Sequence, residues 1–220
     1  MTYLSFFKSE LKLVIRRKQD IVNSLVFFLM IVTLFPLGVN PSSSFLEPAA
    51  GGIIWCSTTL AILMSVETMF KEDFHDGSLE QLVISGLYLP FLILLKLTVQ
   101  WLAVLLPLLI LSPLFSSMLF LPWSILSVLI FTLLLGSPAL FLIGTIGAAL
   151  TLSLRRGAVL MLLIILPFYL PVIIFATGAI TAAQTGQDYM GQLAILAAIS
   201  LAALALSPGM AAISIKASIN

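Results

Sequence analysis

Residues 124–152 read SILSVLIFTLLLGSPALFLIGTIGAALTL, and no charged side chain occurs among them. A helix needs roughly 20 apolar residues to cross the hydrocarbon core of a bilayer, so this stretch is long enough to span one. Gly136-Ser137-Pro138 interrupts it, and because proline removes a backbone donor we expect a kink or a break there. The small residues that follow, Gly144, Gly147 and Ala148, would let neighbouring helices approach closely.

Five further stretches have the same character, and the composition agrees with them. Of 220 residues, 61% are hydrophobic and 9% are charged, against roughly 25% charged in an ordinary soluble domain. We therefore expect an all-α integral membrane protein, a single transmembrane domain over residues 1–220. The expected spans cover residues 21–39, 49–70, 92–112, 124–152, 158–180 and 191–214.

Prolines complicate the ends of two expected spans. Phe35-Pro36-Leu37-Gly38 is typical of a loop, so the first span is expected to end there. Pro167 and Pro171 lie four residues apart in the fifth span and leave two alternatives. The span is simply bent, or it ends early and residues 168–181 form a re-entrant or interfacial element on the outside.

The basic residues collect on one side of the six-span arrangement, whereas the other side carries Glu47 and Asp188 and no basic residue. Basic loop residues accumulate on the cytoplasmic side of a membrane, which predicts cytoplasmic N- and C-termini. Lys96 falls inside the third span near this side, and we expect it to extend toward the headgroups. The basic residues of that side are Lys8, Lys12, Arg16, Arg17, Lys18, Lys71, Arg155, Arg156 and Lys216.

Residues 2–20 are too charged to be a span, but their apolar residues recur at helical spacing. This pattern predicts an amphipathic helix on the inner leaflet, with its basic side among the lipid headgroups. The alternative is a basic tail without such a role. The apolar face would consist of Leu4, Phe7, Leu11, Val14 and Ile15. The membrane-surface basic residues would be Lys8, Lys12, Arg16 and Arg17.

Most polar side chains capable of chemistry lie between the second and third spans, in the cytoplasmic segment 71–90. Asp76 or Ser78 can cap a helix start, and Ser78 with Gln81 has the spacing of a capping box. A short helix with a few exposed apolar groups suits docking against a soluble partner. Its apolar face would consist of Leu79, Leu82 and Val83.

The same residues also have simpler explanations. Glu67 and Lys71 are four residues apart and could form an ordinary helical ion pair. His75 is the only histidine, has no evident metal partners, and is expected at the surface. Glu72, Asp73 and Asp76 could be nothing more than a solvated face.

Several function classes are excluded by what the sequence lacks. No glycine-rich phosphate loop with a lysine is present, so this chain is not expected to hydrolyse ATP. No nucleophilic side chain and general base occur together in a pattern typical of an active site, which predicts no catalytic residues and a protein that is not an enzyme. A net charge of +1 gives no reason to expect nucleic acid as a partner. The one cysteine, Cys56, excludes an intramolecular disulfide, and no metal site is expected.

Six short motifs, in this order, give the chain a resemblance to the CcmB family over nearly its whole length. They are Leu34-Phe35-Pro36-Leu37, Gly52-Ile53-Ile54-Trp55, Asp76-Gly77-Ser78-Leu79-Glu80-Gln81-Leu82, Leu106-Pro107-Leu108-Leu109-Ile110-Leu111-Ser112-Pro113, Leu133-Leu134-Leu135-Gly136-Ser137-Pro138 and Ile174-Phe175-Ala176-Thr177. CcmB proteins are membrane subunits of an ABC-type haem exporter used in cytochrome c maturation. The resemblance therefore implies an ABC-2 type permease with six helices after an amphipathic one, located in the bacterial inner membrane.

The resemblance also implies partners and a docking site. The loop between spans two and three would carry the helix that docks on the ATPase subunit. Expected partners are a CcmA-type ATPase, CcmC- and CcmD-type membrane proteins, a CcmE-type haem chaperone, membrane lipids and a second copy of the chain. ATP would bind to the ATPase, and haem would be handled as a substrate rather than held as a cofactor. The docking residues would be His75, Asp76, Gly77, Ser78, Leu79, Glu80, Gln81 and Leu82.

The substrate and the role of the subunit leave alternatives open. Haem iron usually takes a histidine, cysteine, methionine or tyrosine ligand, and no histidine lies near the outer face. Trp55, Trp101 and Trp123 are scattered rather than gathered in one motif. We favour a subunit that converts a partner's ATP hydrolysis into movement, releasing haem-loaded chaperone, over direct haem transport. The alternatives are a passive membrane scaffold of the complex and an ABC-2 permease for a lipid or drug.

Overall fold

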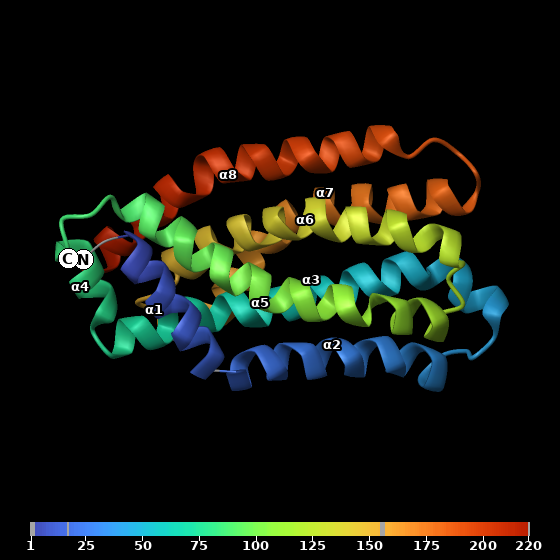
Figure 1. Cartoon of the computed structure of the whole chain (residues 1–220), viewed down its shortest axis with the longest axis horizontal. Coiled ribbons are helices and arrows are strands. Elements are labelled where there is room, and N and C mark those ends of the chain that lie inside the picture. The colour runs from blue at the N-terminus through green and yellow to red at the C-terminus, as the bar shows by residue number, and fades with distance from the viewer. Residues whose placement is uncertain (1–2, 17, 155–156, 220) are drawn as a thin grey trace.

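The computed structural model describes residues 3–16, 18–154 and 157–219, and all regular structure in these residues is helical (Figure 1). Six of the helices are long and apolar enough to cross a membrane, as expected from the sequence. They lie side by side along the long axis of the molecule. The helices are α1 (Tyr3–Arg16), α2 (Lys18–Gly38), α3 (Ser43–His75), α4 (Ser78–Ile84), α5 (Leu89–Met118), α6 (Trp123–Leu150), α7 (Gly157–Gln184) and α8 (Met190–Ile219).

Four of the spanning helices, α3, α5, α7 and α8, extend further at both ends than the apolar stretches that predicted them, whereas α6 ends at Leu150, before the expected residue 152. α3 begins at Ser43 and continues to His75, well beyond the expected 49–70. The first span ends where it was expected to end, because α2 includes Pro36 and stops at Gly38. Backbone N–H of Val39 still donates to the Phe35 carbonyl at 3.1 Å, so the helical turn around Pro36 is closed.

Prolines deep inside the spans do not break the helices. α6 is continuous through Pro138, so the break considered at Gly136-Ser137-Pro138 does not occur. α7 is likewise continuous through Pro167 and Pro171 to Gln184. Of the two alternatives for the fifth span, the re-entrant element at residues 168–181 is wrong, because one continuous helix runs through both prolines.

Helix α6 lies at the centre of the bundle and receives hydrogen bonds from four neighbouring helices. These bonds surround Pro138, where the helix's own ladder lacks a donor. The donors and acceptors are Trp55 Nε1 to Thr132 Oγ1 from α3, Trp101 Nε1 to Ser137 Oγ from α5, Tyr169 Oη to the Leu140 carbonyl from α7, and Ser200 Oγ to the Leu135 carbonyl from α8. These four polar side chains from α3, α5, α7 and α8 are thus paired with groups on α6.

Two glycines of α6 permit this close packing. A Cβ at Gly136 would lie 2.5 Å from Cη2 of Trp55, and one at Gly144 would clash with the hydroxyl of Tyr169. The sequence predicted close helix approach at Gly144, and the structure confirms it. Trp55 and Tyr169 are both fully buried.

The two ends of the bundle differ. Both chain termini, α1 and α4 lie at one end, here called the α4 end (Figure 1). The connections α2–α3, α5–α6 and α7–α8 lie at the opposite end. This arrangement follows from an even number of spans, which returns the chain to the side where it began.

Candidate functional site

The expected docking segment begins where α3 ends. α3 stops at His75, Asp76 and Gly77 form the turn, and α4 starts at Ser78, the predicted position. Gly77 has a φ of 76°, a left-handed conformation that favours glycine. Asp76 Oδ1 accepts the backbone N–H of Ser78 at 2.9 Å, so this carboxylate helps to close the turn.

The expected capping box of Ser78 and Gln81 does not form. Gly77 occupies the N-cap position, and no side chain there caps the helix. The hydroxyl of Ser78 instead donates to the backbone carbonyl of Asp73 at 3.2 Å. This bond ties the first turn of α4 to the last turn of α3.

The packing of α4 differs from the expectation that Leu79 would dock on a partner. Leu79 is 1% exposed and packs into the hydrophobic core of the bundle, so it is unavailable to a partner. Leu82 is half-buried against the same core. The side of α4 that is available consists of Glu80, Gln81 and Ile84, with Ile84 81% exposed.

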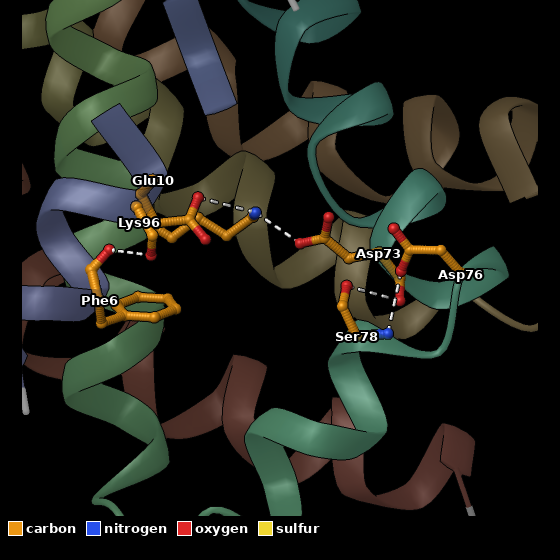
Figure 2. Close-up of polar contacts among 7 residues, drawn as sticks. Phe6, Glu10, Asp73, Asp76, Ser78 and Lys96 are labelled. Atoms are coloured by element: carbon orange, nitrogen blue, oxygen red, sulfur yellow. Dashed lines mark hydrogen bonds and ion pairs between the residues drawn. The ribbon is translucent and has the colours of Figure 1, made fainter. Parts of the chain in front are cut away.

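A buried ion cluster lies beside α4. Lys96 Nζ lies 3.1 Å from Oε2 of Glu10 and 2.5 Å from Oδ2 of Asp73, between the two carboxylates (Figure 2). All three side chains are less than a tenth exposed. They come from α1, α3 and α5, so the cluster joins three helices at the α4 end.

The cluster corrects two expectations. Lys96 does not extend toward the headgroups, because Glu10 and Asp73 bind it inside the protein. Asp73 is buried, so it is not part of a solvated face, whereas Glu72 and Asp76 are exposed as considered. The signal that could have revealed the cluster was a lysine within an apolar span, which requires an acidic partner when buried.

Two openings flank the cluster. A cavity of about 40 Å³, close to the space one water needs, is lined by Glu10, Lys96 and Gln100 among others. A cleft of about 180 Å³ lies between α1 and α4 and is lined in part by Glu10, Asp73 and Leu82. α4 therefore lies next to α1 across open space rather than in close contact along its whole length.

Helix α1 is attached to α5 at a second point. The Tyr3 hydroxyl accepts the backbone N–H of Tyr88 at 3.3 Å, and the Tyr3 ring packs edge-on against Phe91 at 5.0 Å between centroids. Together with the pair formed by Glu10 and Lys96, this contact holds α1 against the bundle along its length.

The predicted apolar face of α1 is mostly directed away from the bundle. The buried residues are Phe6 and Glu10, whereas much of the predicted apolar face is exposed. Apolar and basic side chains together on the exposed side are typical of a helix at a membrane surface. The exposed residues include Leu4, Lys8, Leu11, Lys12, Ile15 and Arg16; Arg17 lies outside the described residues.

The remaining polar residues of this end show no metal-binding arrangement. Lys71 and Glu67 form the expected ion pair, with Nζ and Oε1 2.5 Å apart. His75 is exposed, and its ring faces Phe74 edge-on. In the part of the chain that the structure describes, no group of three His, Cys, Asp or Glu side chains could hold a metal ion.

Comparison with known proteins identifies the family. The model of the family described as CcmB protein matches residues 1–218. The chain belongs to the CcmB family. The resemblance indicated by the six sequence motifs is thereby confirmed, as is the fold class of a multi-pass, all-α membrane protein.

Curated relatives cover the CcmB-family chain from end to end. It is 43% identical to Heme exporter protein B of Haemophilus influenzae over all of both chains. It is 44% identical to Heme exporter protein B of Pseudomonas aeruginosa, over 96% of this chain and 95% of that protein. It is also 42% identical over all of both chains to the protein of that name from Escherichia coli K12. The matches therefore include α1, α3, α4 and α5, which form the site.

Proposed function

We propose that this chain is the membrane subunit of a haem exporter complex that serves cytochrome c maturation, and that it couples ATP hydrolysis on a separate subunit to movement. The observation that supports the coupling role is the position of α4 and the exposure of one of its sides. This short helix at one end of the bundle keeps Leu79 in the core and exposes Glu80, Gln81 and Ile84. A soluble subunit can bind such a surface without disturbing the spans.

The charges support the orientation that this role requires. Exposed Lys8, Lys12 and Arg16 lie on α1 at the α4 end, and Lys216 lies near the end of α8. Basic residues accumulate on the cytoplasmic side, where ATP is available. We therefore place the α4 end and both termini in the cytoplasm and the chain in the bacterial inner membrane.

The proposed complex follows the family. A translocation unit of this type has two membrane halves and two ATPases, so we propose two copies of this chain and two CcmA-type ATPases. CcmC- and CcmD-type membrane proteins and a CcmE-type haem chaperone complete it. Haem would be the substrate handled by the complex, and ATP would bind to the ATPase alone.

The test changes one exposed residue of α4. Ile84→Asp places a charge where a partner would need an apolar contact, and an interface residue of this kind is commonly worth about 2 kcal/mol, a roughly thirtyfold change in affinity. We expect normal amounts of the variant in the membrane, loss of the co-purifying ATPase and loss of covalent haem attachment to c-type cytochromes.

The matched control adds the same charge at the opposite end. Gln187 is exposed in the connection between α7 and α8, so Gln187→Asp should leave the ATPase bound and cytochromes matured. If Ile84→Asp retains the ATPase at normal stoichiometry, α4 is not its docking site. If the ATPase is lost but cytochromes mature normally, the complex has another substrate.

A further inference from the structure

We propose that Lys96, with Glu10 and Asp73, is a positioning cluster that transmits the movement of α4 to α1 and α5. The inference rests on the proposed docking of an ATPase at α4. It assigns a role to three residues that do not contact that partner, because all three are buried.

The first argument is geometric. Lys96 lies 86 residues from Glu10 in the sequence, and its Nζ contacts carboxylates on two other helices. Charged contacts of 3.1 and 2.5 Å are directional and lose strength quickly when the helices shift. A displacement of Asp73 must therefore move Lys96 or break a buried charge pair.

The second argument connects the cluster to α4 through one residue. Asp73 binds Lys96 with its carboxylate and accepts the Ser78 hydroxyl with its backbone carbonyl (Figure 2). Ser78 is the first residue of α4, and Asp73 lies in the last turn of α3. The path from the docking helix to α5 thus has two polar contacts, both made by Asp73.

The third argument is the space available for movement. The cleft of about 180 Å³ between α1 and α4 lies directly beside the cluster and is lined by Glu10, Asp73 and Ser78. On its α1 side, α4 therefore faces open space into which it can shift. Glu10 and Lys96 attach α1 to α5, so a shift of α4 against α1 would be passed on to α5, which is one of the spans.

The fourth argument is energetic. A buried ion pair is on average no more stabilising than well-packed apolar side chains, because desolvation offsets the attraction. Removing one partner, however, leaves an uncompensated buried charge and is strongly destabilising. The contribution expected of this cluster is therefore the relative position of three helices rather than net stability.

The test removes all three charges together, so that no buried charge is left alone. In the variant Glu10→Gln/Asp73→Asn/Lys96→Met, we expect normal membrane levels, a normal amount of bound ATPase and continued ATP hydrolysis. Maturation of c-type cytochromes should fall at least about tenfold, because hydrolysis no longer moves α5. The separate single variant Lys96→Arg retains the positive charge, and it should keep most of the cytochrome maturation of the unchanged protein.

The control pair lies on α3 and has the same chemistry. Glu67 and Lys71 form a partly exposed pair within one helix, so Glu67→Gln/Lys71→Met should leave maturation unchanged. Normal maturation in the triple variant would overturn the proposal. Loss of the triple variant from the membrane would also overturn it, by making the cluster a stability element. Loss of the ATPase from Ile84→Asp tests docking separately, because the triple variant should retain the ATPase.

Discussion

The indole Nε1 of Trp101 donates a 2.8 Å hydrogen bond to Oγ of Ser137, the residue before Pro138 in α6. Pro138 has no backbone N–H, so the carbonyl one turn earlier lacks its usual donor. Ser200 from α8 meanwhile binds the Leu135 carbonyl. Side chains of neighbouring helices thus hold α6 in place at the position where its own hydrogen bonding is weakest.

The bond between Trp101 and Ser137 predicts a stability effect. Trp101→Phe would leave the buried Ser137 hydroxyl without this donor, and we expect the free energy of unfolding to fall by about 1 kcal/mol. The decrease in stability is measured by thermal unfolding of the purified protein in detergent. Trp123→Phe is the control, because Trp123 is 66% exposed and should be neutral. Equal unfolding midpoints for both variants would contradict the prediction.

Close packing at Gly144 predicts a second effect. Gly144→Ala introduces a Cβ against the buried hydroxyl of Tyr169, which is bound to the Leu140 carbonyl and cannot easily move. Overpacking of this kind costs about 1–3 kcal/mol. Gly209→Ala in α8 meets nothing within 4 Å and should be neutral or slightly stabilising. The thermal unfolding midpoints of the two variants are compared. A Gly144→Ala variant as stable as the unchanged protein would contradict the prediction and show that α7 can move to make room for the methyl group.

The two sides of α4 should separate stability from docking. Leu79→Ala removes a side chain that is 1% exposed and should cost about 2–5 kcal/mol in free energy of unfolding. Ile84→Ala removes one that is 81% exposed and should leave stability unchanged. Unfolding midpoints and ATPase co-purification are measured on both variants. A stable Leu79→Ala that loses the ATPase would show that Leu79 docks after all.

Membrane orientation can be tested with single cysteines in a Cys56→Ser background, since Cys56 is the one native cysteine. Ser44 and Ser85 are exposed. Ser44 lies in the first turn of α3, at the α2–α3 connection, and Ser85 directly follows α4, so they lie at opposite ends of the bundle. We expect Ser44→Cys to react with a membrane-impermeant maleimide added to spheroplasts. Ser85→Cys should react only after the membrane is opened. The reverse pattern would invert the proposed topology.

The sequence predicted the spans because apolar length and missing charge are local properties. The same reasoning missed helix ends, since the polar residues Ser43 and His75 can continue a helix beyond the hydrocarbon core. The end of the first span was predicted correctly, and Pro36 fits inside the last turn of α2 because a proline there interrupts few hydrogen bonds. Local signals thus located the spans but not all of their limits.

The site was predicted less completely, and the reason is distance in sequence. The start of α4 at Ser78 follows from Asp76 and Gly77, which are its neighbours. The burial of Leu79 depends instead on how α4 packs on the bundle, which periodicity within seven residues does not reveal. Lys96 within a span indicates that an acidic partner is needed, but Glu10 lies 86 residues away, so the sequence does not show which residue that partner is.

The position of α4 between early and late parts of the chain has a consequence for the order of assembly. Residues 78–84 are synthesised well before α8, but α4 also packs against α8. The surface around Ile84 thus reaches its final position only after α8 has inserted. An ATPase that binds this surface would select finished subunits over nascent or truncated ones.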